Sequence, residues 1–208
     1  MKLEDWLLRF YFPIVDEFGY SVSDDAESAR VLEEVGELYS WNVLEKFRGK
    51  TAIIIGNGPN PDFSSAIFSR EIDRKESVVI TAGKAILRYE GRIDIHVTDL
   101  DEGYDAVCRA ADRAILVVHA HGDNIEIVRE FVPSLGRIIG TTQYIPFGRV
   151  YNFGGFTDGD RAAIIAKTLA EKVKLVNFDF SRAENETKLR KLKWARRILE
   201  FEGLLLDF

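Results

Sequence analysis

Six short apolar runs, most of them separated by helical patterns, constrain the fold of this chain more than any other feature. The runs are TAIII (51–55), SVVIT (77–81), DIHV (94–97), AILVV (114–118), RIIGT (137–141) and KLVNF (174–178). TAIII and AILVV are apolar on both faces, as strands buried in a parallel sheet are. Strands that alternate with helices predict a parallel sheet wound on both faces. We therefore expect an α/β fold with a doubly wound, mostly parallel sheet of about six strands.

The first 48 residues predict helices rather than strands. Apolar residues recur at helical spacing from Trp6 to Phe18, and a second amphipathic pattern runs from Ala29 to Leu44, with Gly49 as its expected end. We expect an N-terminal helical cap over residues 1–48. An α/β catalytic core would follow over residues 49–208 and end in a basic helix. Support of the core is the preferred role of the cap, and a lid or a homodimer contact are the alternatives.

Composition excludes several classes of protein. A net charge of −6 and a pI of about 5.2 argue against binding to nucleic acid. Apolar runs fall short of the roughly 20 residues that span a bilayer, and the N-terminus lacks a secretory signal, so we expect a cytoplasmic protein that binds no membrane. Cys108 is the one cysteine, which excludes an internal disulfide framework. Scarce Gln, Cys and Met beside plentiful Lys, Arg and Glu are typical of thermophiles.

An unusual polar motif follows each of the first five apolar runs. The motifs are GNGPNP, TAGK, TDLDE, HAHGDN and the long segment TTQYIPFGRVYNFGGFTDGD. Ligands of parallel α/β sheets bind outside the carboxyl ends of the strands. The five motifs are therefore predicted to meet at one edge of the sheet, where a binding site would form.

The motif TDLDE suggests a magnesium site. Asp99 and Asp101 lie two residues apart, and Mg²⁺ prefers one or two carboxylates together with substrate phosphates and water. A charged, solvated turn is the alternative, and Glu102 is interpreted as solvated. Asp158 starts a clear helix, so it either caps that helix or faces the metal.

The remaining motifs leave alternatives open. HAHGDN resembles the start of a zinc site, but the chain has only three histidines and none follows His121, so such a site cannot be completed. GNGPNP is a phosphate-binding turn or an ordinary strand-to-helix turn, since it lacks both the third glycine of the dinucleotide motif and a Walker lysine. Arg161 either reaches a nucleotide phosphate or forms a surface ion pair. Lys84 and Lys191 either reach nucleotide phosphates or are simply solvated on the surface.

Several motifs together resemble a known family. VTDLD, VVHAHGDN, TTQ, NFGGFTDGDRA and a final KLKWA, within roughly residues 50–200, are similar to the archaeal-type 6-hydroxymethyl-7,8-dihydropterin diphosphokinases. That family is similar in fold to the catalytic domain of thiamine pyrophosphokinase. The resemblance implies a Mg²⁺-dependent transfer of diphosphate from ATP to the hydroxymethyl group of a pterin alcohol, with release of AMP.

Site residues follow from matching these motifs. Asp99, Asp101 and Asp158 match the family's metal-site acids, and Asp101 and Asp123 are the expected catalytic residues. Substrate contacts are expected from Gly56, Asn57, Gly58, Pro59, Asn124 and Thr157, and ATP contacts from Lys84, Arg161 and Lys191. Phe153 and Phe156 are candidates for stacking on the pterin.

Two positions depart from the family pattern. Asn60 stands where members often have Ser, and Gly83 stands where many carry an acid after the second strand. The second departure leaves open a non-catalytic protein that senses a nucleotide or pterin. Two further alternatives are a thiamine pyrophosphokinase, which shares fold, metal and leaving group, and a glycosyltransferase whose D-x-D motif holds a metal and a sugar nucleotide.

Overall fold

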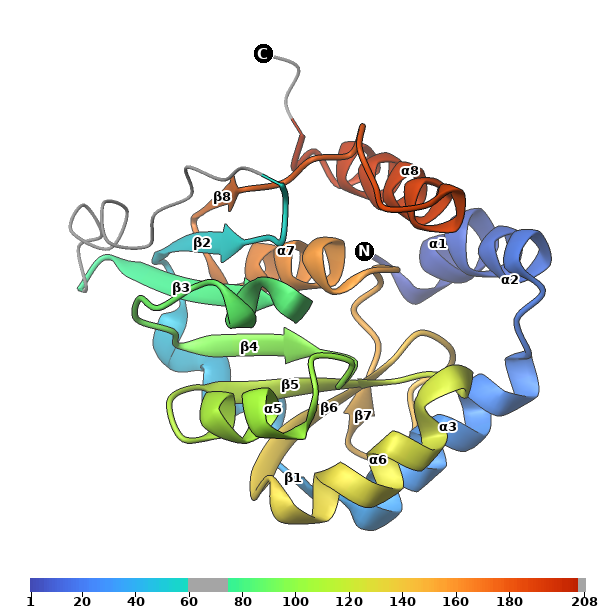
Figure 1. The fold of residues 1–208 in the computed structure, drawn as a ribbon, viewed down its shortest axis with the longest axis horizontal. Coiled ribbons are helices and arrows are strands. Elements are labelled where there is room, and N and C mark those ends of the chain that lie inside the picture. The colour runs from blue at the N-terminus through green and yellow to red at the C-terminus, as the bar shows by residue number, and fades with distance from the viewer. Residues whose placement is uncertain (60–74, 206–208) are drawn as a thin grey trace.

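A single parallel sheet organises the molecule (Figure 1). The computed structural model describes residues 1–59 and 75–205, and within them the strand order is β1-β6-β5-β4-β3-β2-β8, with β7 also paired to β6. The six long strands are β2 (Thr51–Ile55), β3 (Ser77–Ala82), β4 (Ile95–Thr98), β5 (Ile115–Ala120), β6 (Arg137–Thr142) and β8 (Lys172–Val176). All ladders between the named strands are parallel, which confirms the predicted sheet. Two short strands, β1 (Glu37–Leu38) and β7 (Val150–Tyr151), join β6 in addition.

Helices cover both faces of the sheet. In the described part of the chain, the helices outside the N-terminal segment are η3 (Gly83–Leu87), α5 (Tyr104–Ala111), η4 (Gly122–Asn124), α6 (Ile125–Phe131), η5 (Val132–Ser134), α7 (Asp158–Leu169) and α8 (Glu186–Phe201). Successive side chains of a strand point to opposite faces. In β2, Ile54 accordingly belongs to the core under α7, whereas Ile53 and Ile55 pack with Tyr89 on the other face. A second core under α5 and α6 completes the double winding.

The N-terminal segment forms several short helices instead of two long ones. They are α1 (Leu3–Trp6), the π-helix η1 (Leu7–Tyr11), α2 (Phe12–Phe18), α3 (Val22–Val35) and the 3-10 helix η2 (Trp41–Phe47). The helix expected to run on to Leu44 was therefore wrong. The chain leaves α3 at Gly36, whose backbone is extended, and Leu38 then pairs beside Ile138 of β6. Sheet pairing and burial of Leu38 outweigh the helical periodicity here. The division into cap and core stays a prediction.

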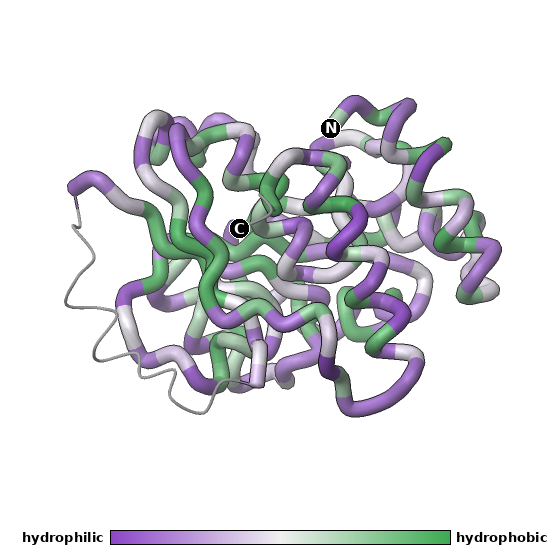
Figure 2. Tube along the Cα trace, turned by 90° about the horizontal axis from the view of Figure 1, so that it is seen from above, coloured by the Kyte–Doolittle hydropathy of each residue, from purple (hydrophilic) through white to green (hydrophobic). Residues whose placement is uncertain are grey.

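Trp6, Tyr11 and Ile14 pack with Ile164 of α7 and with α8. The helices α1, η1 and α2 therefore lie against α7 and the basic helix α8, whereas α3 packs beside α6 (Figure 1). Apolar stretches of the chain run through the middle of the molecule and hydrophilic ones lie along its outer segments (Figure 2). Among the residues described, we find no helix long and apolar enough to cross a membrane.

The carboxyl ends of β2 to β6 lie at one edge of the sheet, as parallel pairing requires. Gly56, Gly83, Asp99, His121 and Gln143 each come directly after one of these strands. The predicted meeting of the five motifs at one edge is thereby confirmed for the residues that the structure describes. Asn60 and Pro61, the last two residues of GNGPNP, lie outside them.

Candidate functional site

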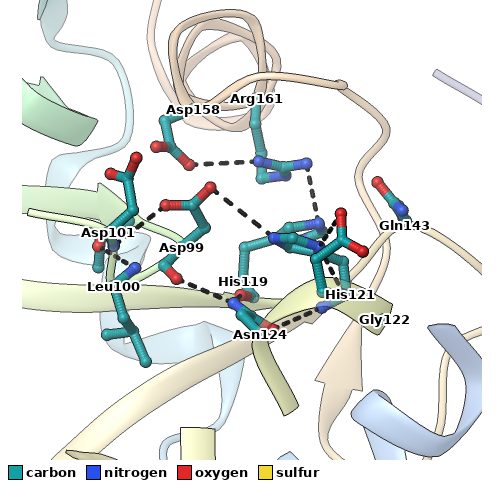
Figure 3. Close-up of polar contacts among 12 residues, drawn as sticks. Asp99, Leu100, Asp101, His119, His121, Gly122, Asn124, Gln143, Asp158 and Arg161 are labelled. Atoms are coloured by element: carbon teal, nitrogen blue, oxygen red, sulfur yellow. Dashed lines mark hydrogen bonds and ion pairs between the residues drawn. The ribbon is translucent and has the colours of Figure 1, made fainter. Parts of the chain in front are cut away.

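A tight turn after β4 brings three carboxylates together. Figure 3 shows two of them, Asp99 and Asp101. Asp99, Asp101 and Glu102 each place a carboxylate oxygen within 4.8 Å of the others. Leu100 between them adopts a left-handed φ of 74°, a conformation that costs a branched residue roughly 1–3 kcal/mol and is found mostly at functional sites. The Leu100 amide donates to Thr98 Oγ1 at 2.7 Å, which holds the turn in this shape. Like charges forced together in this way are suited to a divalent cation.

Glu102 is buried, so its interpretation as a solvated side chain was wrong. It is 8% exposed, and its Oε2 accepts a hydrogen bond from Thr98 Oγ1 at 2.6 Å. Its Oε1 lies 3.5 Å from His96 Nε2, and neither atom has a hydrogen-bond partner among the described residues. The hydrogen bond from Thr98, the last residue of β4, holds the Glu102 side chain in this buried position. A buried carboxylate oxygen without a hydrogen-bond partner is consistent with a site that binds a cation.

Asp158, at the start of α7, lies beside this turn. Burial, together with the charge of Asp99, raises the pKa of the Asp158 carboxyl well above its ordinary value. Gly83 after β3 approaches the same side chain. A Cβ added at Gly83 would lie 2.7 Å from Asp158 Oδ2, and the backbone φ of Gly83 is +52°. The missing acid of the second-strand motif thus has a steric explanation, because a side chain at position 83 would collide with Asp158.

Electrostatics separate Asp99 from Asp101. Burial opposes ionisation of Asp99, but a hydrogen bond from His121 and the charges of His121 and Arg161 lower its pKa to about 2. The pKa of Asp101 is raised, by burial and by the charges of Asp99 and Glu102, against the effect of Lys84. Lys84 Nζ lies 2.8 Å from Asp101 Oδ2, so one predicted ATP-binding residue directly pairs with a predicted metal ligand.

Arg161 is almost wholly buried rather than on the surface. Its NH1 lies 3.4 Å from Asp158 Oδ1, and its NH2 donates to Gly155 O at 3.0 Å and to His119 Nε2 at 2.9 Å. Because arginine only donates, His119 Nε2 must accept, and its proton sits on Nδ1 facing Thr141 Oγ1 at 3.2 Å. Burial, and after it Arg161, holds the pKa of His119 well below its usual range, so this histidine is neutral.

The HAHGDN loop forms the other side of the site. His121 Nδ1 accepts from the Asp123 amide at 3.3 Å, and its Nε2 lies 3.8 Å from Asp99 Oδ2. Asn124 is 4% exposed, and its side chain hydrogen-bonds backbone groups in and beside the loop. Its amide donates to the carbonyl oxygens of Asp99 and His119, both at 2.9 Å, and its oxygen accepts from the His121 amide. The Asp123 side chain is 68% exposed.

A pocket opens between this loop and the N-terminal segment. Its walls are Tyr20, Ser21, Asp24, Asp25, Asp99, His119, His121, Gly122, Asp123, Gln143, Phe156, Arg161 and Lys191. The pocket thus contains Asp99, Asp123, Arg161 and Lys191 from the predicted site, together with the stacking candidate Phe156. The Lys191 ammonium lies 5.6 Å from the ring centroids of both Tyr20 and Phe156.

Several predicted residues lie away from that pocket. Gly56 and Gly58 pack against the end of β8, where a Cβ on Gly58 would lie 2.4 Å from the carbonyl oxygen of Asn177. Asn57 and Pro59 are exposed beside them. Thr157 caps α7 through reciprocal hydrogen bonds with Asp160. Phe153 packs on Trp41 with ring centroids 4.2 Å apart. The substrate roles of Gly56, Asn57, Gly58, Pro59 and Thr157 stay predictions.

The family described as "6-hydroxymethylpterin diphosphokinase MptE-like" matches residues 29–185. The chain belongs to this family. Relatives agree with the match over nearly the whole length. A protein of Pyrococcus furiosus named 6-hydroxymethyl-7,8-dihydropterin pyrophosphokinase is 36% identical, covering 97% of this chain and 94% of the relative. Proteins of the same name from Methanothermobacter thermautotrophicus and Methanocaldococcus jannaschii are 35% and 32% identical, covering 100% and 97% of this chain and 95% of each relative.

This member of the MptE-like family has pocket residues that the sequence did not reveal as such. Asp25 is 2% exposed and accepts hydrogen bonds from Tyr11 Oη at 2.7 Å, from the Gly122 amide at 2.8 Å and from Gln143 Nε2 at 3.0 Å. Tyr20 and Asp24 stand nearby in the same segment. The polar patch SVSDD was the available signal, but it reads as a helix start because Ser21 caps α3.

Proposed function

We propose that this protein transfers diphosphate from ATP to 6-hydroxymethyl-7,8-dihydropterin and releases AMP. The printed names of three relatives, each aligned over at least 97% of this chain, give the substrate and the type of reaction. The observation that carries the proposal is the carboxylate turn Asp99–Glu102 beside buried Asp158 and Lys84. Transfer of a phosphoryl group depends mainly on positioning the reactants and on neutralising the phosphate charge. It therefore needs metal-binding carboxylates and a cation such as these, and no covalent nucleophile.

The donor set fits a magnesium ion. Asp99 and Asp101 would hold Mg²⁺, with Glu102 in the same cluster and Asp158 beside it. Bound there, Mg²⁺ would neutralise charge on the phosphate oxygens of ATP. Lys84 already pairs with a carboxylate of this set and would move to a phosphate when the metal takes its place.

In the proposed reaction, the hydroxymethyl oxygen attacks the β-phosphorus of ATP. The bond from the β-phosphorus to the oxygen shared with the α-phosphate breaks, and AMP leaves with that oxygen. Asp123 orients the hydroxyl and accepts its proton, since its carboxylate is exposed at the pocket and lies 4.0 Å from His121. Lys191, at the mouth of the same pocket, contacts the transferred phosphates. A role of Arg161 in ATP binding stays a prediction, because its guanidinium already bonds Asp158, His119 and Gly155.

Product analysis tests the proposal. The purified protein is incubated with ATP, Mg²⁺ and 6-hydroxymethyl-7,8-dihydropterin, with thiamine in a parallel reaction, and nucleotides are separated by anion exchange. Pterin-dependent AMP without ADP is the expected result. AMP formed with thiamine alone would transfer the function to thiamine pyrophosphorylation, and no AMP in either reaction would refute a diphosphokinase. A cytoplasmic location and a homodimer belong to the same proposal, and sedimentation would test the second.

A further inference from the structure

The N-terminal segment is locked onto the functional edge by buried hydrogen bonds. Trp6 Nε1 donates to the carbonyl oxygen of Gln143 at 2.6 Å, and Gln143 Nε2 lies 3.0 and 2.9 Å from the two carboxylate oxygens of Asp25. Tyr11 and the Gly122 amide complete the shell of Asp25. A buried carboxylate with this many donors is held firmly in place. The side-chain nitrogen of Gln143 donates to Asp25, so the side-chain oxygen of Gln143 faces the His119 side of the pocket, where it can accept a hydrogen bond (Figure 3).

Contact between the segment and the HAHGDN loop is also tight. A Cβ added at Gly122 would lie 2.8 Å from the Cβ of Asp24. The glycine of this motif is therefore explained by the start of α3, which lies directly on it. Tyr20, Asp24 and Asp123 line the same pocket. The N-terminal segment thus forms a wall of the site and does more than support the core.

Charge decides which substrate this pocket suits. Apart from Asp25, which accepts hydrogen bonds from the protein, and Asp99, which is assigned to the metal, its walls carry the carboxylates of Asp24 and Asp123 and the cations Arg161 and Lys191. The Arg161 charge is already paired with Asp158. An excess of negative charge disfavours the polyphosphate and nucleotide of ATP. It suits a neutral ring that presents N–H donors, because carboxylates accept hydrogen bonds and do not donate them when ionised.

Shape agrees with charge. Tyr20 and Phe156 present rings 6.3 Å apart at 59° to each other on one side of the pocket. Aromatic side chains stack on flat heterocycles of any sequence or substitution. A pterin combines such a ring with adjacent N–H donors on its aminopyrimidinone edge, whereas the nucleotide side of ATP would have to bring its phosphates past Asp24 and Asp123.

We infer that this pocket is the acceptor site, in which Tyr20 and Phe156 hold the pterin ring, Asp24 accepts hydrogen bonds from its donor edge, and Asp25 is a positioning residue that fixes Gln143. The nucleotide then lies on the Lys84 side of the carboxylate turn, and its transferred phosphates reach Lys191 at the mouth of the pocket. The inference rests on the proposed function. It makes the N-terminal segment, which lies mostly before the region matched to the family, the part that selects the acceptor.

Steady-state kinetics on two variants test the inference. Tyr20→Leu removes the ring and keeps apolar bulk, and Asp24→Asn removes one charge. We expect the KM for the pterin to rise about tenfold in Tyr20→Leu, as loss of a stacking ring predicts, and severalfold in Asp24→Asn. The KM for ATP should stay within about twofold of wild type in both. Tyr104→Leu and Asp16→Asn, which alter exposed residues outside the pocket, are the matched controls.

The positioning role of Asp25 has its own readout. Asp25→Asn should raise the KM for the pterin and leave the KM for ATP unchanged, a split that a general loss of stability would not produce. Tyr11→Phe, which removes one of the donors to Asp25, should show the same split to a smaller extent.

Three results would overturn the acceptor assignment. They are a raised KM for ATP in Tyr20→Leu, a lowered KM for ATP in Asp24→Asn, and unchanged constants in both. Calorimetric titration of the pterin without ATP separates this failure from failure of the proposed function. Wild-type protein that binds the pterin but forms no AMP would refute the reaction, and unaltered pterin affinity in Tyr20→Leu would refute the pocket.

Discussion

Asp25 and the acids of the turn Asp99–Glu102 have opposite hydrogen-bond environments. Asp25 is surrounded by donors from Tyr11, Gly122 and Gln143, so its charge is fully stabilised by the protein. The turn Asp99–Glu102 instead concentrates carboxylates whose main described cation is exposed Lys84, and Glu102 keeps an oxygen without a hydrogen-bond partner. Saturation of the carboxylate therefore distinguishes a structural acid from one that awaits a ligand. Four measurements can break or sharpen this distinction.

The largest effect is expected for Asp101→Asn. Loss of a metal carboxylate removes several kcal/mol of stabilisation from the transition state, so turnover should fall about a thousandfold or more. Thermal stability should hold or rise, because repulsion with Asp99 is relieved. Asp105→Asn, which neutralises an exposed acid of α5, is the control and should keep full activity. Near-normal turnover in Asp101→Asn would remove this residue from the mechanism.

Asp25→Ala should act in the opposite way, on stability first. It leaves the donors of Tyr11, Gly122 and Gln143 unpaired in the interior, at a cost of about 3 kcal/mol in the free energy of unfolding. Urea titration measures the loss, and Glu27→Ala on the exposed side of the same helix is the control. A loss as small as that of the control would show that Asp25 is not structural.

The neutral histidine between the two groups gives a pH-dependent test. The pKa of His119 is lowered on folding, so the unfolded chain binds a proton that the folded chain excludes as the pH falls below about 6.5. Wild type should therefore lose on the order of 1 kcal/mol more stability than His119→Gln between pH 7.5 and pH 5.5. The difference should vanish above pH 7.5. Parallel stability curves for the two proteins would contradict a buried, neutral His119.

Ser28→Ala is expected to have the smallest effect on stability, and one opposite in sign to that of Asp25→Ala. Ser28 is buried on the same helix, and its hydroxyl has no partner among the described residues. Removing an unsatisfied hydroxyl and gaining helix propensity should stabilise the protein by about 0.5 kcal/mol. The midpoint of a urea titration measures the gain. A loss above 1 kcal/mol would mean that the hydroxyl is bonded in solution.

Much of the fold was predictable because local patterns and the sheet agree. The six apolar runs became strands β2 to β6 and β8, and the meeting of their motifs followed from parallel pairing alone. The break at Gly36 was not predictable from periodicity, because Leu38 keeps the helical spacing. Leu38 instead pairs with Ile138 of β6, which is about a hundred residues away in the sequence. The polar patch before α3 likewise reads as a cap until α3 is packed on Gly122.

The candidate site residues also differ in whether the sequence alone could identify them. Asp99 and Asp101 stood out as candidates because they directly follow an apolar strand, and Asp158 because it starts a clear helix after a glycine pair. Burial of Arg161 and of Glu102 was not recognisable, because it depends on His119 and on the left-handed turn at Leu100. Tertiary contacts, rather than residue type, therefore decide which polar side chains of this edge remain available to substrates.

The central claim is that the carboxylate turn binds a divalent cation while Asp25 serves structure. Its most direct test is Mn²⁺ titration, followed by electron paramagnetic resonance, with α,β-methylene-ATP, whose α–β bridge cannot be cleaved. Wild type and Tyr11→Phe should bind Mn²⁺ alike, and Asp101→Asn should bind it at least about tenfold more weakly. Equal affinity in wild type and Asp101→Asn would contradict the account.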